Sequence, residues 1–183
     1  MKQQKKKVLG EERRELILQW LMDEEQPITG TLLATKTNVS RQVIVQDISI
    51  LKARNFPILA TAQGYVYFKE QPKTDLVSRV IACKHSPEKT AEELNIIVDY
   101  GGIVKDVAVE HPVYGDLTAS LMIRNRRDVQ LFITKMATTN ASLLSQLTDG
   151  VHLHTIEARR KDILDEICNT LSEAGFLLSS EDN

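Results

Sequence analysis

Cysteine is scarce in this chain, which has two cysteines, Cys83 and Cys168, among 183 residues. A small secreted domain held together by disulfides needs more, so we expect a reducing compartment, the cytoplasm. No apolar run approaches the roughly 20 residues of a membrane-spanning helix, and the polar, basic residues 1–7 do not resemble a signal peptide. We therefore expect a cytoplasmic protein without a membrane partner.

The net charge is small, −2, but it is unevenly distributed along the chain. Residues 1–72 carry 11 Lys and Arg against 8 Asp and Glu, a net charge of +3. Residues 73–183 carry 12 against 17, a net charge of −5. A polyanion such as DNA would thus meet the first part of the chain. Ordinary surface charge could produce the same difference, so charge alone does not identify the partner.

The first part of the sequence has the pattern of a helix-turn-helix. Apolar residues at helical spacing predict a helix over residues 11–24. After a break, Thr29 is placed to cap a short helix that ends near Lys36, and Ser40 to cap a longer helix over residues 41–53. A short helix, a tight turn and a capped second helix are the helix-turn-helix layout.

The second helix of this motif carries polar side chains away from its apolar stripe. Arg, Gln and Ser reach base edges and phosphates in a major groove, and Val can contact a thymine methyl group. The alternative is an ordinary solvated helix face. The residues expected to contact DNA are Ser40, Arg41, Gln42, Val45 and Gln46.

Two β-prone runs, 58–62 and 65–68, surround a Gln-Gly turn and predict a hairpin directly after the second helix. With the motifs Val-Ser-Arg-Gln-Val-Ile at 39–44 and Asp-Ile-Ser-Ile-Leu-Lys at 47–52, residues 9–70 resemble winged helix-turn-helix domains of the kind found in the biotin-operon repressor. The resemblance implies that the second helix lies in the major groove and the hairpin, the wing, along the DNA backbone. Gln63 and Tyr65 at the wing tip are the further expected contacts. We place this domain at residues 1–70, before a polar linker at 69–74.

Residues 75–183 read as a second domain with the element order β-α-β-β-α-β followed by a helix. The strands are expected at 75–84, 103–111, 117–123 and 151–157, and the helices at 86–100, 126–139 and 158–174, with a short final strand at 176–178. This order predicts a split βαβ arrangement, an antiparallel sheet with helices on one face. The whole chain is thus expected to be an α+β protein.

Histidines and a carboxylate in this domain have the pattern of a metal site. His152 and His154 alternate with apolar residues on a strand and so share one face. His85 directly precedes a helix on which Glu93 lies beside apolar Leu94, leaning toward the helix start. Three imidazoles and a carboxylate suit Zn²⁺ or Ni²⁺. A structural role for each residue is the alternative, and Cys83 is a rival ligand that more typically packs as a small buried residue.

Three motifs resemble the 3H domain, named for its histidines: Cys-Lys-His-Ser at 83–86, Glu-His-Pro-Val-Tyr-Gly at 110–115, and the segment 147–158. A winged helix-turn-helix followed by a 3H domain resembles the niacin-responsive repressors of the NiaR/YrxA type, over about residues 9–175. The resemblance implies a cytosolic homodimer that binds operator DNA and represses genes of NAD synthesis or niacin uptake, with nicotinic acid as co-repressor.

The resemblance also implies one divalent metal ion per chain, nickel or zinc. Carried over to this sequence, its ligands are His85, Glu93, His152 and His154, with Glu88 and Glu92 as alternatives to Glu93. His111 would lie near the effector pocket. The ring nitrogen of nicotinate could occupy an open position on the metal, while Arg124, Arg126 or Arg127 holds the carboxylate.

Two other functions remain open from the sequence. One is a metal-sensing repressor without an organic effector, and the other is a metal-dependent hydrolase with a DNA-binding domain. The chain has no Gly-rich phosphate loop and no further cluster of acid and base groups, so we expect that it is not an enzyme.

Overall fold

The fold is given by a computed structural model that describes residues 9–68 and 75–178. The chain divides into two compact units, Met1–Pro72 and Lys73–Asn183. The linker expected at 69–74 lies outside the described residues. Within the described ranges, no helix combines the length and the apolar character needed to cross a bilayer.

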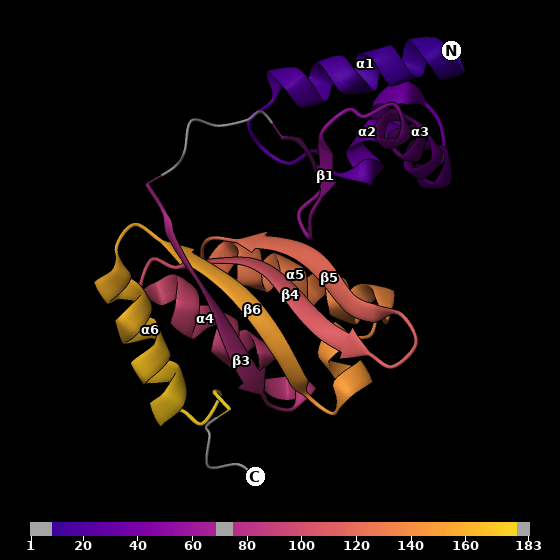
Figure 1. The fold of residues 1–183 in the computed structure, drawn as a ribbon. Coiled ribbons are helices and arrows are strands. Elements are labelled where there is room, and N and C mark those ends of the chain that lie inside the picture. The colour runs from indigo at the N-terminus through magenta and orange to yellow at the C-terminus, as the bar shows by residue number, and fades with distance from the viewer. Residues whose placement is uncertain (1–8, 69–74, 179–183) are drawn as a thin grey trace. The chain divides into compact units, whose positions relative to one another are not determined.

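The first unit consists of three helices followed by a two-stranded hairpin (Figure 1). The elements are α1 (Gly10–Asp23), α2 (Gly30–Thr37), α3 (Arg41–Ala53), β1 (Ile58–Ala60) and β2 (Tyr65–Tyr67). The two strands pair antiparallel. The predicted winged helix-turn-helix layout is confirmed.

The turn between α2 and α3 is fixed by its capping residues. Thr29 Oγ1 accepts a hydrogen bond from the Leu32 N–H at 3.1 Å, and Ser40 Oγ accepts one from the Val43 N–H at 3.4 Å. Asn38 adopts a left-handed conformation, with φ of 54°, and ends α2. Such caps typically stabilise a helix by about 1 kcal/mol each. Both expected capping residues are confirmed.

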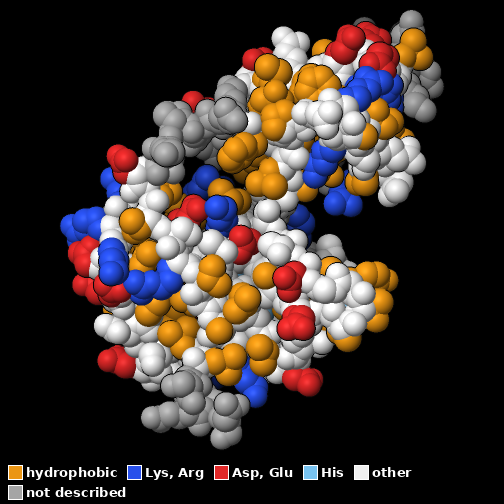
Figure 2. Space-filling view, viewed as in Figure 1, with side chains coloured by type: hydrophobic (Ala, Val, Ile, Leu, Met, Phe, Trp, Pro, Cys, Tyr) orange, Lys and Arg blue, Asp and Glu red, His pale blue; other side chains and the backbone are white. Residues whose placement is uncertain are grey.

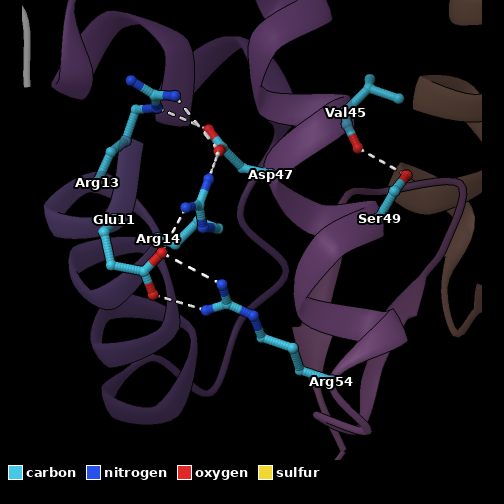
Figure 3. A network of polar contacts seen from close by, with 7 residues as sticks. All are labelled: Glu11, Arg13, Arg14, Val45, Asp47, Ser49 and Arg54. Carbon is cyan, nitrogen blue, oxygen red and sulfur yellow. Dashed lines mark hydrogen bonds and ion pairs between the residues drawn. The ribbon is translucent and has the colours of Figure 1, made fainter. Parts of the chain in front are cut away.

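A buried ion pair holds α1 against α3 (Figure 3). Arg13 Nε donates to Asp47 Oδ2 at 2.6 Å, and Arg14 Nη1 donates to Asp47 Oδ1 at 3.1 Å. Nearer the surface, Arg54 Nη1 donates to Glu11 Oε1 at 2.6 Å. The apolar core beside this network contains Ile17, Leu21, Leu33, Ile44, Ile48 and Leu51. The helices are therefore joined by polar contacts as well as by their apolar stripes.

The wing is attached to the segment that precedes α2. The N–H groups of Ile28 and Tyr65 each donate to the carbonyl oxygen of the other residue at 2.9 Å. Gly64 has φ of +147°, and a Cβ there would lie 2.6 Å from Ile28 O. Only glycine allows this backbone approach, so the glycine of the turn fixes the position of the wing.

The second unit is built on a four-stranded sheet in the order β3-β6-β4-β5, in which all neighbours are antiparallel. Two of its strands, β3 and β4, are parallel to each other and are separated by β6, which confirms the predicted split βαβ arrangement and the α+β class. The elements are β3 (Val77–Lys84), η1 (Pro87–Lys89), α4 (Thr90–Asp99), β4 (Ile103–His111), β5 (Gly115–Ile123), α5 (Arg126–Thr139), η2 (Leu144–Thr148), β6 (Val151–Ala158) and α6 (Lys161–Glu173).

The helices of this unit cover one face of the sheet, and α4 and α5 lie behind the strands in Figure 1. The core between α4, α6 and the sheet contains Leu94, Ile97, Val104, Ile156, Ile167 and Leu171. Among residues 75–178, no helix covers the opposite face, which includes Val80, 60% exposed, and Leu153, 42% exposed. Figure 2 shows hydrophobic side chains on the side turned to the viewer. Side chains that alternate on β6 therefore point either to the helices or to the open face.

Three details differ from the sequence prediction. Ser86 does not cap α4 with its side chain, because a 3₁₀ turn, η1, intervenes, and α4 begins at Thr90. β6 continues to Ala158, so α6 begins at Lys161 rather than at 158. The short strand expected at 176–178 is reduced to one bridge, Leu177 with Cys83.

Candidate functional site

The structure brings together the four residues expected to bind metal, on the helix-covered face of the sheet. His152 and His154 pair with Cys83 and Ile81 of β3, and the side chains of both histidines are almost fully buried, with 3% and 4% exposure. Glu93, on α4, is completely buried. The side chain of His85, just after β3, is 3% exposed. Glu88 and Glu92 are exposed and belong to no such cluster.

The three imidazoles converge on one carboxylate oxygen. Glu93 Oε2 lies 2.8 Å from His85 Nε2, 3.4 Å from His152 Nε2 and 3.4 Å from His154 Nε2. The other oxygen, Glu93 Oε1, is buried without a hydrogen-bond partner among the described residues. Four potential ligand atoms thus point toward a common centre, and one of the two carboxylate oxygens is left unsatisfied.

Backbone carbonyl groups determine which ring nitrogens carry hydrogen. His85 Nδ1 lies 2.8 Å from Ser86 O, His152 Nδ1 2.8 Å from Gly150 O, and His154 Nδ1 2.7 Å from Asp106 O. A carbonyl oxygen only accepts, so each Nδ1 donates, and each neutral ring keeps its lone pair on Nε2. Three lone pairs then face an anion, an arrangement that requires positive charge. Carbonyl groups orient metal-binding histidines in the same way.

The electrostatics of the cluster favour a negative Glu93 beside positive charge. Burial raises the pKa of the Glu93 carboxyl, but hydrogen bonds with His152, His154 and His85 outweigh it, so this pKa lies well below its usual range. Burial lowers the pKa of His85 and His154, and the hydrogen bond with Glu93 reverses this, so both pKa values are raised. Without a metal ion, protons on the histidines supply the positive charge beside Glu93. A divalent cation would supply that charge instead.

Local structure explains how residues far apart in the sequence meet here. Gly150 has φ of +88°, and a Cβ at this position would lie 2.4 Å from His85 O. The β-bulge between Val104 and Asp106 accompanies the turning of Asp106 O toward His154. Phe176 is buried and packs edge-on against the His85 ring, with centroids 5.3 Å apart. None of these supporting contacts could be expected from the sequence, because they depend on tertiary structure.

Cys83 lies next to the cluster. Its sulfur, a Glu93 carboxylate oxygen and a His152 ring nitrogen are all within 4.8 Å of one another. Burial, followed by the negative charge of Glu93, raises the pKa of the Cys83 thiol. A metal-binding cysteine must be a thiolate. In the absence of metal the neutral thiol packs beside the histidines. Cys83, Glu93 and His152 form a second set of possible ligand atoms, which overlaps the cluster of three histidines and one glutamate.

A cavity of about 170 Å³ opens beside the cluster. His85, Glu93, His152 and His154 form one part of its lining, and Thr90, one helical turn before Glu93 on α4, also lines it. The remaining wall is mostly apolar and comes from β4, β5, α5 and η2. It includes Val107, Leu121, Phe132, Met136, Leu143 and Leu144. A cavity of roughly 150 Å³ can hold benzene, so this one suits a ligand with a single ring.

The two residues expected to bind the effector lie outside this lining. His111 is at the end of β4, where its Nδ1 accepts hydrogen bonds from the N–H groups of Val113 and Tyr114 at 3.1 and 3.3 Å. Arg124 is exposed after β5, and its backbone N–H donates to Asp128. Arg126 is paired with Asp99 on the surface. Neither His111 nor Arg124 therefore lines this cavity, and their contact with an effector stays a prediction.

The residues expected to contact DNA lie on one side of α3 and on the wing. Ser40, Arg41, Gln42 and Gln46 are exposed, and Val45 is half-buried. The Ser49 hydroxyl donates to Val45 O at 2.8 Å, so it is engaged with its own helix (Figure 3). Gln63 lies in the β1–β2 turn, and Tyr65 begins β2. The exposed side chains of α3 are thus available to a groove.

A helix-turn-helix unit is a DNA-binding module whose second helix lies in the major groove. Comparison with known families agrees. Residues 13–66 match a helix-turn-helix (HTH) domain and residues 78–180 match the 3H domain. The chain belongs to the family of 3H-domain proteins with an N-terminal helix-turn-helix domain.

Two relatives are similar to the chain over almost its whole length. "Transcription repressor NadR" of Bacillus subtilis (strain 168) is 55% identical over 173 residues, covering 94% of this chain and 96% of that protein. "Probable transcription repressor NiaR" of Thermotoga maritima is 40% identical over 172 residues, covering 94% of this chain and 97% of that protein. The resemblance noted from the sequence motifs is confirmed at the level of the family.

Proposed function

We propose that this chain is a cytoplasmic, DNA-binding transcription repressor whose second unit binds one divalent transition-metal ion, nickel or zinc, and nicotinic acid as co-repressor. The genes controlled would be those of NAD synthesis or niacin uptake. The observation that carries the proposal is the convergence of three imidazole Nε2 atoms on Glu93 Oε2 beside a single-ring cavity. Both relatives are named as transcription repressors, which supports the DNA-binding part of this proposal.

The metal proposal is supported by the chemistry of the ligand atoms. His85, His152, His154 and Glu93 offer three neutral nitrogens and one anionic oxygen, a set that suits zinc or nickel. When bound, the metal would neutralise the buried carboxylate and provide a positive centre at the edge of the cavity. The chain's own contribution is orientation, because each imidazole is fixed through Nδ1 by a backbone carbonyl.

The DNA-binding proposal places α3 in the major groove and the wing on the phosphate backbone. A homodimer would present two copies of α3 to a palindromic operator. Repression follows if nicotinic acid favours the arrangement of the two DNA-binding units that fits both half-sites. The oligomeric state is tested by light scattering of the metal-loaded protein, for which we expect twice the mass of one chain.

Operator binding measured with and without each ligand tests the function directly. Four titrations of the same DNA are compared: metal-free protein, metal alone, nicotinate alone, and both together. We expect tight binding only with both. Tight binding with metal alone would identify a metal-sensing repressor, and breakdown of nicotinate or related compounds by the purified protein would favour the hydrolase alternative.

Removal of the Arg41 side chain tests the orientation of α3. Arg41→Ala should weaken operator binding and reduce the slope of log K against log salt by about 0.9, because one phosphate contact is lost. The control is Arg160→Ala, which removes an exposed arginine from the second unit. An unchanged salt slope in Arg41→Ala would exclude Arg41 from the contact with phosphate.

A further inference from the structure

Thr90 is a buried polar residue that the proposed metal site does not use. It is 7% exposed and lines the cavity, and its hydroxyl oxygen has no hydrogen-bond partner among the described residues. It precedes Glu93 by one helical turn on α4, so both side chains lie on the same face of the helix. A buried hydroxyl without a partner is costly and calls for an explanation. A ligand in the cavity would provide the missing partner.

The charges around the cavity restrict how a ligand can lie. None of the described residues that line it is a lysine or an arginine. A carboxylate in this apolar space would therefore find no cationic side chain among them, and it would share the cavity with the carboxyl group of Glu93. The bound divalent cation would be the only positive centre. The two positive charges of a divalent cation would be balanced by Glu93 and by the carboxylate of a ligand. A neutral amide ligand would instead leave one positive charge uncompensated.

This charge balance orients a single-ring carboxylate. Its carboxylate faces the cation, and the opposite, ring end lies among the apolar side chains of the cavity. A ring nitrogen there would be desolvated and would need a hydrogen-bond donor. Thr90 Oγ1 is a buried hydroxyl of the cavity lining that is free to donate.

We propose that Thr90 is the residue that selects the ligand, by donating a hydrogen bond from its hydroxyl to the ring nitrogen of a monocarboxylate bound through its carboxylate. This inference rests on the proposed function of the site and reverses the ligand orientation expected from the sequence, in which the ring nitrogen met the metal and Arg124 the carboxylate. The charge of the bound cation then distinguishes an acid from its amide. The Thr90 hydroxyl distinguishes a pyridine ring from a benzene ring.

The test compares two ligands that differ in one atom. Nicotinate and benzoate share the carboxylate and the six-membered ring, but benzoate lacks the nitrogen. Their affinities for the metal-loaded full-length protein are measured by titration calorimetry, for the native chain and for Thr90→Val. The native chain should bind nicotinate about tenfold more tightly than benzoate, and Thr90→Val should bind both with the affinity that the native chain has for benzoate.

Three controls keep the result specific. Thr90→Ser retains the hydroxyl and should retain the preference for nicotinate. Thr118→Val makes the same exchange at an exposed position on β5 and should change neither affinity. The metal content of each variant, measured by elemental analysis, should remain one ion per chain, since Thr90 is not a ligand.

Each other outcome has a defined meaning. If Thr90→Val weakens nicotinate and benzoate equally, Thr90 contacts the carboxylate and the proposed orientation is wrong. If the preference for nicotinate survives in Thr90→Val, Thr90 does not select the ligand. If the native metal-loaded protein binds neither compound, the proposed effector itself fails, a result that is distinct from the first two.

Discussion

At the scale of single residues, Glu93 supplies the carboxylate on which the three imidazoles of the cluster converge. Its carboxylate is completely buried, and all three Nε2 atoms lie within 3.4 Å of its Oε2. An amide at this position would remove the negative charge and offer N–H groups to the imidazole lone pairs. The metal binding that we propose therefore depends on the charge of this one side chain.

Glu93→Gln should abolish binding of zinc or nickel, measured as metal per chain after dialysis. Without metal, the variant should melt at a temperature no lower than that of the native chain. The amide N–H groups can donate hydrogen bonds to the imidazole lone pairs, which the carboxylate cannot do. Glu92→Gln makes the same exchange at the neighbouring exposed position and should leave the metal content unchanged. Full metal occupancy in Glu93→Gln would remove Glu93 from the ligand set.

Gly150 is a second residue on which the site depends, because its backbone lies against His85. Gly150→Ala should destabilise the second unit and weaken metal binding by at least tenfold, since the new Cβ would lie 2.4 Å from His85 O. Gly101→Ala is the matched control: its φ of +81° is close to the +88° of Gly150, but a Cβ there meets nothing within 4 Å. Equal metal affinities of the two variants, measured by competition with a chelator, would argue against this contact.

Much of the metal cluster could be predicted at the residue scale, whereas the cavity contacts could not. The alternation of His152 and His154 places both on one face, and the apolar positions around Glu93 favour it over its exposed neighbours. Thr90 resembles any other helix residue in the sequence, and its importance depends on a cavity wall formed by distant segments. His111 was associated with the effector through family resemblance, which does not show where its ring points.

At the scale of elements, the contact between α1 and α3 depends on Asp47. This carboxylate is 2% exposed and is bonded to Arg13 and Arg14. Removing one member of a buried ion pair leaves uncompensated charge, at a typical cost of about 3–5 kcal/mol. The position of the recognition helix α3 thus depends on a polar contact that the apolar periodicity did not reveal.

Asp47→Asn should lower the stability of the first unit by about 3 kcal/mol or more. Trp20, the only tryptophan, lies on α1 in this unit, so its fluorescence during urea unfolding monitors the relevant transition. Glu11→Gln is the control, because it also removes an acidic partner of Arg14 but at an exposed position. A shift in Asp47→Asn as small as that of the control would contradict a structural role for the buried pair.

The elements themselves were well predicted where hydrophobic periodicity and caps agree, as in α3 and β6. Their boundaries shifted where a tertiary contact extended or replaced a local signal. Ser86 has the sequence signature of a cap, yet its carbonyl accepts from His85 Nδ1 while a 3₁₀ turn delays the helix. The strand order was not predictable in detail, because periodicity identifies strands but not their neighbours.

At the scale of the whole molecule, each unit has its own core. The histidine–glutamate cluster and the cavity belong entirely to the second unit, and Trp20 belongs to the first. A ligand stabilises only the part of a protein whose native form binds it. Metal binding should therefore affect the two unfolding transitions differently.

Removal of metal with a chelator should lower the melting temperature of one calorimetric transition and leave the urea unfolding curve of Trp20 unchanged. Adding nicotinate to the metal-loaded chain should raise the same transition. Asp47→Asn should lower the melting temperature of the other transition, that of the first unit. The two changes together then assign each transition to its unit. A single transition that responds to both changes would show that the units unfold together.

The place of β6 in the sheet also has a consequence for biosynthesis. β6 is the last strand to leave the ribosome, yet it occupies an interior position between β3 and β4. A nascent chain that ends before residue 151 has neither the His-Leu-His segment nor the strand that joins those two partners. Such a chain exposes unpaired strand edges and lacks two of the three imidazoles. The proposed metal site would thus be complete only after the whole domain has been synthesised, and truncated products would lack two of its donors.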